Sequence, residues 1–225
     1  MVLERIKEGL IVSCQALAEE PLHSSFIMSK MAKAAEMGGA NGIRANSVED
    51  IKAIRKETSM PVIGIIKQDY NNSEVYITAT MQEVEALLET NCEIIALDAT
   101  KRKRPNGENI QSLLDKIHEA DRLAMADIST FEEGIEAEKL GFDLISTTLS
   151  GYTEYTEEAS TPDFNLVKEL SSRATIPVIM EGRTRTPEHV KKGLECGAYA
   201  VVVGSIITRP QYITKLYAEA IKEIK

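Results

Sequence analysis

The sequence has no tryptophan, and it has only three histidines and three cysteines in 225 residues. The cysteines are an odd number and none belongs to a C-x-x-C pair, so they predict neither a disulfide framework nor a zinc or redox centre. The histidines share no spacing typical of metal ligands. We therefore expect no metal, no histidine base and a reducing, cytoplasmic location. The residues concerned are Cys14, Cys92, Cys196, His23, His118 and His189.

The chain also lacks a long apolar run and an excess of positive charge. No stretch approaches the roughly 18 to 20 apolar residues of a membrane span, and Met1 to Leu10 has no export signal. The 26 Lys and Arg against 35 Asp and Glu give a net charge of -9, which repels a nucleic-acid backbone and an anionic membrane. Neither is expected as a partner, and an anionic ligand needs a local cluster of amides and basic side chains.

Short apolar runs of strand length recur through the whole chain, each followed by a segment of helical periodicity and by turn residues. Runs such as VIGII and AVVVG are apolar at every position, which is typical of parallel strands buried on both faces. Eight strands are predicted, at Leu10–Cys14, Gly42–Ala45, Val62–Ile66, Ile94–Leu97, Leu123–Ala126, Leu144–Thr147, Val178–Met180 and Ala200–Val203. Helices are predicted at Ser24–Met37, Ser47–Thr58, Met81–Thr90, Ile110–Ala120, Thr130–Leu140, Phe164–Arg173, Pro187–Cys196 and Pro210–Lys225.

This alternation predicts an α/β protein, with residues 1–225 forming a single (β/α)8 TIM barrel of the phosphate-binding type. An open, doubly wound sheet uses the same pattern of elements, so the count of eight units is what favours closure. Two connections, Gln68 to Thr80 and Gly151 to Pro162, are longer than usual and follow strands, where a barrel keeps its active-site loops.

Polar residues stand at the carboxyl end of every predicted strand or directly after it. In a barrel these positions converge on the active site, because they lie at the carboxyl ends of the strands. Any single one is better explained as a solvated strand end or a helix cap, whereas the full set favours a site. The positions are Gln15, Arg44, Lys67, Asp98, Asp127, Thr147 with Thr148, Glu181 and the pair Gly204-Ser205.

Lys67 is the best candidate for a chemical role, because it ends the apolar run PVIGII and burial there favours the neutral amine. A neutral amine can remove a proton from carbon or form a Schiff base with a carbonyl, although a structural salt bridge is an alternative. Glu181 follows PVIM and is expected to face Lys67 across the barrel mouth; the alternative is an ion pair with Arg183 or Arg185.

The loops after the seventh and eighth strands contain Gly182 with Arg183, and Gly204 with Ser205 and Arg209. Barrels often bind phosphate here, with backbone amides and the N-terminus of a short extra helix. We therefore predict a phosphate site in this otherwise acidic chain. The basic run Lys101–Arg104 is interpreted differently, as an exposed and solvated loop.

The chain resembles the bacterial N-acetylmannosamine-6-phosphate 2-epimerase family over essentially its full length. The resemblance implies an isomerase that interconverts N-acetylmannosamine 6-phosphate and N-acetylglucosamine 6-phosphate by inverting C2, in sialic-acid and amino-sugar catabolism. It further implies no cofactor and a homodimer. The stretches that carry it are GLIVSCQAL, EPLHSS, GGANGIRAN, PVIGIIKQDY, ALDATKRKRP, LAMADIST, STTLSGYT and ITRP.

By the same resemblance, Lys67 removes and returns the C2 proton and Glu181 is its acidic partner, while Gln15, Arg44 and Asp127 hold the sugar. Ser205 departs from the family, which usually has a second glycine there. Two other functions use the same residues: a Schiff-base aldolase or lyase acting on a phosphosugar, and a phosphosugar-binding barrel without catalysis.

Overall fold

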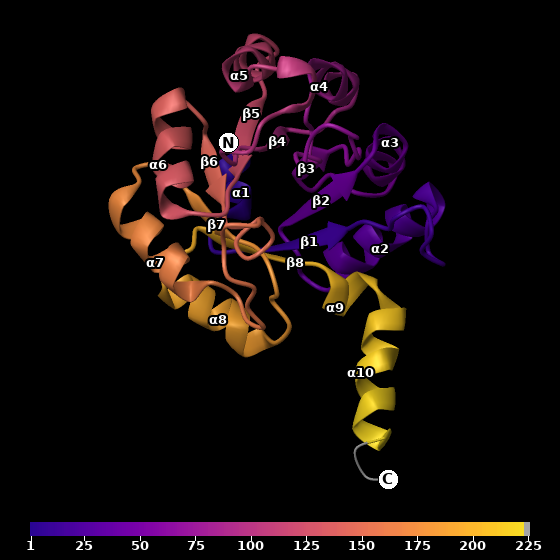
Figure 1. Cartoon of the computed structure of the whole chain (residues 1–225). Helices are drawn as coiled ribbons and strands as arrows, with labels where there is room; N and C mark the ends of the chain where they lie inside the picture. Colours follow the sequence, from indigo (N-terminus) through magenta and orange to yellow (C-terminus); the bar gives the residue numbers. More distant parts are fainter. Residues whose placement is uncertain (223–225) are drawn as a thin grey trace.

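The structure, a computed structural model that describes residues 1–222, is a closed barrel of eight parallel strands in the order β1 to β8 (Figure 1). Pairing of β1 with β8, in which Leu10 lies opposite Val201, closes the barrel and excludes the open sheet. The predicted strands are confirmed, and each end agrees within one residue. The strands are β1 (Leu10–Cys14), β2 (Gly42–Asn46), β3 (Val62–Ile65), β4 (Ile94–Asp98), β5 (Leu123–Asp127), β6 (Leu144–Ser146), β7 (Val178–Met180) and β8 (Ala200–Val203).

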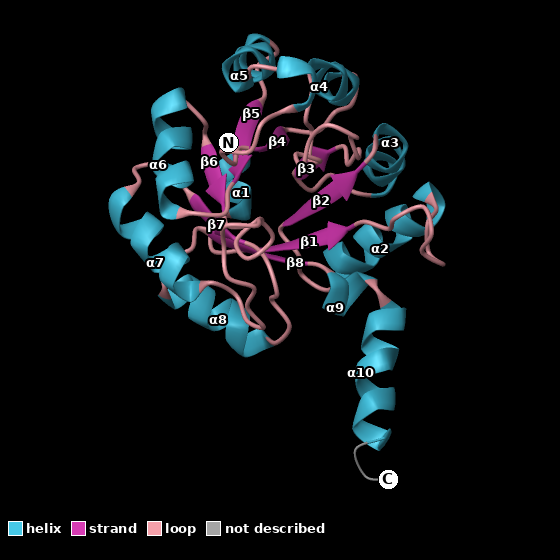
Figure 2. Cartoon of the chain, viewed as in Figure 1, coloured by secondary structure: helices cyan, strands magenta, loops and turns pink. Residues whose placement is uncertain are grey.

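The longer helices surround the strands as an outer layer, with the exception of the last, which points away from the barrel, whereas the first short helix lies inside the ring (Figure 2). The predicted helices are confirmed to within two residues at their described ends; the predicted end at Lys225 lies outside the described residues. They are α2 (Ser25–Met37), α3 (Val48–Glu57), α4 (Met81–Leu88), α5 (Ile110–Glu119), α6 (Phe131–Leu140), α7 (Phe164–Arg173), α8 (Pro187–Glu195) and α10 (Pro210–Lys222). Three shorter turns of helix join them: α1 (Val2–Ile6), η1 (Pro105–Gly107) and α9 (Ser205–Thr208).

Side-chain capping fixes where several of these helices begin. Thr80 and Glu83 form a reciprocal capping box at α4, and Thr130 and Glu133 form another at α6. Each box satisfies backbone N–H groups that lack partners in the first helical turn. The capping boxes therefore fix the residues at which the loops after β3 and β5 end and the helices begin.

The core has two shells, which explains why the strands are apolar at every position. One set of strand side chains, including Ile63, Ile94 and Met125, fills the barrel interior. The alternate set, including Ile43 and Ile95, packs outward against the helices. Ile6 of α1, the short helix before β1, is 1% exposed and joins the interior cluster. No helix among residues 1–222 is long and apolar enough to cross a membrane.

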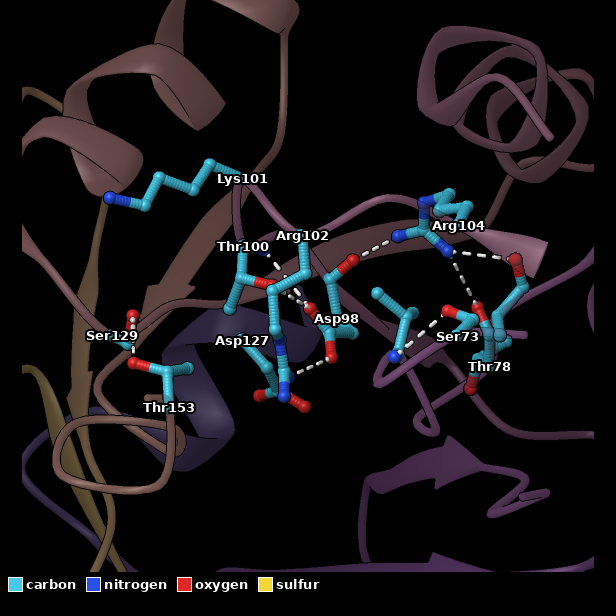
Figure 3. Close-up of polar contacts among 12 residues, drawn as sticks. Ser73, Thr78, Asp98, Thr100, Lys101, Arg102, Arg104, Asp127, Ser129 and Thr153 are labelled. Atoms are coloured by element: carbon cyan, nitrogen blue, oxygen red, sulfur yellow. Dashed lines mark hydrogen bonds and ion pairs between the residues drawn. The ribbon is translucent and has the colours of Figure 1, made fainter. Parts of the chain in front are cut away.

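The prediction that Lys101–Arg104 is a solvated charge run is wrong for its two arginines. The Arg102 guanidinium forms a 2.7 Å ion pair with the fully buried carboxylate of Asp98, and its side chain is 7% exposed. Arg104 is 8% exposed and donates to the main-chain carbonyls of Ala79, at 2.9 Å, and Asp98 (Figure 3). A run of basic residues favours solvation when only its charge is considered. In the fold, nearby carbonyl and carboxylate oxygens accept from both guanidinium groups and offset the free-energy cost of burying them.

These arginine contacts position the long connection after β3. Arg104 also reaches the carbonyl of Thr78, at 3.3 Å, and Ser73 donates back to the carbonyl of Lys103 at 2.8 Å. The segment 68–80 is thereby fixed over the carboxyl end of the barrel. It carries Tyr76 into the cavity described below.

Candidate active site

A cavity of about 270 Å³ opens at the carboxyl ends of the strands, between side chains from β1, β2, β3 and β8 and from the loops after the strands, including the loop after β7. Ten of the residues singled out in the sequence line it: Gln15, Arg44, Lys67, Thr148, Glu181, Gly182, Arg183, Gly204, Ser205 and Arg209. The closed barrel therefore brings these residues from the strand ends together. The remaining three, Asp98, Asp127 and Thr147, are buried and do not line the cavity.

Lys67 presents an unengaged amine to this cavity. Its backbone is fixed, because its N–H donates to Asn46 Oδ1 at 2.9 Å and its main chain pairs with Ile77. Within residues 1–222 its Nζ forms no hydrogen bond or ion pair. Burial and, to a smaller extent, the nearby positive charge of Arg44 together lower the pKa of Lys67 to about 8, against the opposing effect of Glu181. The structural salt bridge considered as an alternative is not present in the described part of the chain.

Arg44 is the buried centre of the charge network. It is 1% exposed and binds Asp127 with both terminal nitrogens, Nη1 to Oδ1 at 3.0 Å and Nη2 to Oδ2 at 2.5 Å. Nη1 also donates to Glu181 Oε2 at 2.5 Å. Burial alone lowers the pKa of Arg44, but the two carboxylates outweigh it and raise the value. Glu181 therefore pairs with Arg44, and not with either Arg183 or Arg185.

Glu181 keeps one carboxyl oxygen available. Its side chain is 14% exposed; Oε2 accepts from Arg44, whereas Oε1 has no hydrogen-bond partner within residues 1–222. Burial raises the pKa of Glu181, Arg44 opposes that rise, and the negative charge of Asp127 adds to it. A carboxyl group with a raised pKa and a free oxygen at the cavity is suited to hold or release a proton.

Asp127 and Thr147 are buried behind the residues that line the cavity, and they hold Arg44 and Glu181 in place. Asp127 is fully buried beneath Arg44. Thr147 is 1% exposed, donates to the carbonyl of Glu181 at 2.9 Å and accepts from the Glu181 N–H at 3.1 Å. The sequence predicts Thr147 or Thr148 at the site; β6 ends at Ser146, and of the two it is Thr148 that lines the cavity.

The loops after β7 and β8 form the other end of the cavity. Gly182 has a φ of +108°, a conformation that favours glycine, and the next residue, Arg183, donates to the carbonyls of Ser150 and Gly151 at 2.7 and 2.8 Å. Arg209 binds Ser205 Oγ at 3.1 Å and forms a two-point ion pair with Glu20, with Nε 2.7 Å from Oε1. Glu20 thus holds the guanidinium at the cavity edge.

Several lining residues escaped sequence reasoning. Tyr76 and Tyr152 come from the two long connections. The length of these connections predicted active-site loops but did not indicate which of their side chains line the cavity. Burial raises the pKa of Tyr76 to about 12, with Asp127 and Asp98 adding to the effect, so its phenol stays protonated. Thr184 also lines the cavity, and its buried hydroxyl has no partner within the described chain. No group of three His, Cys, Asp or Glu suited to a metal ion occurs among residues 1–222.

Comparisons with known proteins point to one family. Residues 28–223 match the family described as "Putative N-acetylmannosamine-6-phosphate epimerase". Relatives described in the same terms, as 2-epimerases, come from Clostridium perfringens strain SM101, 62% identical with 98% of this chain and 100% of the relative covered, and from Caldanaerobacter subterraneus, 58% identical with 99% and 94% covered. A solved N-acetylmannosamine-6-phosphate 2-epimerase from Clostridium perfringens aligns at a TM-score of 0.96 and 61% identity over 98% of this chain and 96% of the other.

Proposed function

The chain belongs to the N-acetylmannosamine-6-phosphate epimerase family, and we propose that its barrel interconverts N-acetylmannosamine 6-phosphate and N-acetylglucosamine 6-phosphate by moving the proton at C2. The observation that carries the proposal is the pair of free proton-transfer atoms, Lys67 Nζ and Glu181 Oε1, in one cavity. They come from the ends of β3 and β7, which stand on opposite sides of an eight-stranded barrel. Inversion requires removal of a proton from one face of C2 and delivery to the other.

In this proposal, Lys67 takes the C2 proton in its neutral form and Glu181 provides or receives the proton at the opposite face. The C2 hydrogen of the open-chain sugar is acidic because the neighbouring C1 is a carbonyl carbon. The enolate oxygen that develops on proton removal is stabilised by positive charge and hydrogen-bond donors. Arg44 and the Tyr76 hydroxyl are such donors at this cavity.

The remaining polar atoms fit the rest of the substrate. Gln15 is 7% exposed and its Oε1 has no partner within the described chain, so it can accept a hydrogen bond from an amide or hydroxyl of the sugar. The backbone at Gly182 and Gly204, together with Ser205 and Arg209, fits the 6-phosphate. Ser205 adds a hydroxyl where a glycine is usual, and that hydroxyl already contacts Arg209.

The direct test is to follow N-acetylmannosamine 6-phosphate by proton and phosphorus NMR in the presence of the purified protein. We expect N-acetylglucosamine 6-phosphate to appear, and the reverse reaction to reach the same equilibrium mixture. Retention of the starting sugar by folded protein, with tight binding shown by calorimetry, would instead identify a binding barrel without catalysis.

Arg209→Ala is expected to weaken phosphosugar binding more than it slows the chemical step. Removal of a guanidinium that pairs with a phosphate costs a charge-assisted interaction, which corresponds to about a ten- to hundredfold rise in KM. The rise should be absent for Arg173→Ala, which removes the same charge from an exposed position at the end of α7. Steady-state kinetics of both variants measure it, and a KM equal to that of the wild type in Arg209→Ala would contradict the assignment.

We also propose a homodimer in which α10 contacts a second copy of the chain. This helix buries none of its residues, and Leu216, Tyr217 and Ile221 are 40%, 73% and 61% exposed along it (Figure 1). An amphipathic helix normally buries its apolar stripe, so exposure of this stripe in a single chain favours contact with a partner surface. Light scattering should give twice the mass of 24.8 kDa, and Leu216→Glu with Tyr217→Glu should lower it to one chain. A monomeric wild type would contradict the proposal.

We further propose that residues 1–225 work as one barrel domain in the cytoplasm. All three cysteines are free thiols, and two of them, Cys14 and Cys92, are buried, which suits a reducing compartment. The barrel core is continuous from β1 to β8, and no described segment forms a second core apart from it.

A further inference from the structure

The segment 66–78, which follows β3, folds back on itself as a short hairpin. Lys67 pairs in antiparallel orientation with Ile77. Next to this pair, the Gln68 N–H donates to the carbonyl of Tyr76 at 3.0 Å. Lys67, Tyr76 and Ile77 all line the cavity. The returning arm of the hairpin is therefore part of the cavity wall, and its position decides the shape of the substrate space.

The returning arm ends at a residue with an unfavourable backbone conformation. Thr78 is fully buried and has a φ of +44°, in the left-handed region. A β-branched residue adopts this region only where the surrounding contacts hold it. The Thr78 N–H donates to the carbonyl of Ile66 at 2.7 Å, and the Thr78 hydroxyl accepts from the Ile66 N–H at 3.2 Å. The Thr78 carbonyl accepts from the Arg104 guanidinium at 3.3 Å, so Arg104 is one of the contacts that hold this conformation (Figure 3).

Arg104 is buried without a carboxylate partner. It is 8% exposed, belongs to the loop after β4 and forms no ion pair within residues 1–222. Among these residues its guanidinium donates only to main-chain carbonyls, those of Thr78 and Ala79 at the end of the hairpin and that of Asp98 at the end of β4. Burial of a guanidinium without a counter-charge is costly, and the convergent carbonyl acceptors offset that cost. The side chain therefore ties the end of the hairpin to β4.

Tyr76 is the side chain of the returning arm that can form a hydrogen bond in the cavity. Its hydroxyl makes no hydrogen bond within the described chain, so it is free to donate to a ligand. Thr78 is the joint between this arm and the start of α4 at Met81. A change in the Thr78 backbone conformation therefore redirects the arm and moves the Tyr76 hydroxyl relative to a bound sugar.

We propose that Arg104 is a positioning residue, whose guanidinium holds Thr78 in its left-handed conformation and so places the Tyr76 hydroxyl against the substrate. The inference rests on the proposed epimerase function and deepens it, since it makes substrate recognition depend on a residue outside the cavity. Arg104 does not line the cavity, so its effect on turnover passes through the hairpin. The same effect is expected whichever group moves the C2 proton.

The first test is a double-mutant cycle of Tyr76→Phe and Arg104→Met, measured as kcat/KM for N-acetylmannosamine 6-phosphate. Tyr76→Phe removes one hydroxyl and should lower kcat/KM about three- to tenfold. Arg104→Met keeps most of the side-chain length but no donor, and should lower kcat/KM by about tenfold or more. In the Arg104→Met background, Tyr76→Phe should cost less than about twofold, because the hydroxyl is already displaced. Losses that multiply as they do for independent sites would overturn the role of Arg104.

Hydrogen–deuterium exchange tests the same role without turnover. In Arg104→Met, the amides of Gln68 and Thr78, which bond across the hairpin, should exchange about tenfold faster or more than in the wild type. Arg55→Met is the matched control, because Arg55 also donates to a main-chain carbonyl, that of Met60 at 2.7 Å, but ahead of β3 at the amino end of the barrel. Exchange in the hairpin and kcat/KM should both stay at the wild-type level in this control.

Thermal unfolding identifies the variants that are folded. If Arg104→Met does not fold, Arg104→Lys, which keeps the charge but not the planar set of donors, takes its place in both experiments. Wild-type exchange in the hairpin of a folded Arg104 variant would overturn the role of Arg104 and leave the epimerase function intact, as would an equal fall of kcat/KM in Arg55→Met. Absence of epimer with the wild type would overturn the proposed function, and this inference with it.

Discussion

Lys67→Ala is expected to lower kcat for epimerisation by about 10²- to 10⁴-fold, the range typical of a lost general base, with a much smaller change in KM. The reason is that the Lys67 amine accepts the proton that leaves C2. Within the described chain the amine makes no ion pair on which the fold depends. The Lys67 side chain ends in the cavity, so its truncation leaves no buried polar group without a hydrogen-bond partner. The fold should therefore survive the change, and the effect should appear in the chemical step.

Lys67→Arg sharpens the same test, because arginine keeps the length and the charge but does not release its proton at working pH. We expect it to be about as slow as Lys67→Ala, whereas Lys139→Ala, which alters a lysine that is 68% exposed on α6, should match the wild type. A kcat near that of the wild type in either Lys67 variant would remove Lys67 from the mechanism. Borohydride added with substrate should leave Lys67 unmodified; covalent trapping there would indicate Schiff-base chemistry of the aldolase or lyase class.

Arg44→Met is expected to have the largest effect on stability, about 3 to 5 kcal/mol of unfolding free energy at pH 7. Arg44 is the only described positive charge bonded to Asp127, which is fully buried, and it is the ion-pair partner of Glu181. Replacement by an apolar side chain of similar length fills the space but leaves two carboxylates without a counter-charge. Activity should be lost as well, since Glu181 loses the contact that aims it.

The pH dependence of the stability loss in Arg44→Met shows whether the missing counter-charge causes it. Without Arg44, burial and the negative charge of Asp127 raise the pKa of Glu181 in the folded state further above its unfolded value, so the variant gains relative stability as pH falls and loses it as pH rises. The difference from wild type in urea unfolding should therefore be smaller at pH 5 than at pH 7. Arg173→Met on the exposed end of α7 is the matched control and should change stability by less than about 0.5 kcal/mol. An equal loss at both pH values would indicate packing as the cause.

The barrel could be predicted closely because its strands depend on local burial. Runs such as Val62–Ile65 and Ala200–Val203 are apolar on both faces, and the residue after each strand is therefore placed at the barrel mouth. That rule was sufficient to select Lys67 and Glu181. It could not distinguish Thr147 from Thr148, since β6 ends one residue before the predicted end and the chain then turns.

Most of the contacts that sequence reasoning missed join residues far apart in the sequence. Arg102 and Arg104 belong to a run of four basic residues that suggested solvent. Their burial depends on carbonyls of the loop after β3 and on the carboxylate of Asp98 at the end of β4. Likewise, Arg44 bridges Asp127 and Glu181 across 83 and 137 residues of sequence. Residue type and spacing do not encode such pairings, because they arise only when the strands are arranged in a closed ring.

The central claim is that this cavity moves a proton at C2, and its most direct test is the reaction of N-acetylmannosamine 6-phosphate in D2O. The account predicts N-acetylglucosamine 6-phosphate that carries deuterium at C2, because the amine and the carboxyl group exchange their protons with solvent before returning one. Lys67→Ala should show neither epimer nor deuterium on the same time scale. Epimer that keeps its original C2 hydrogen throughout, formed by folded wild-type protein, would contradict the account.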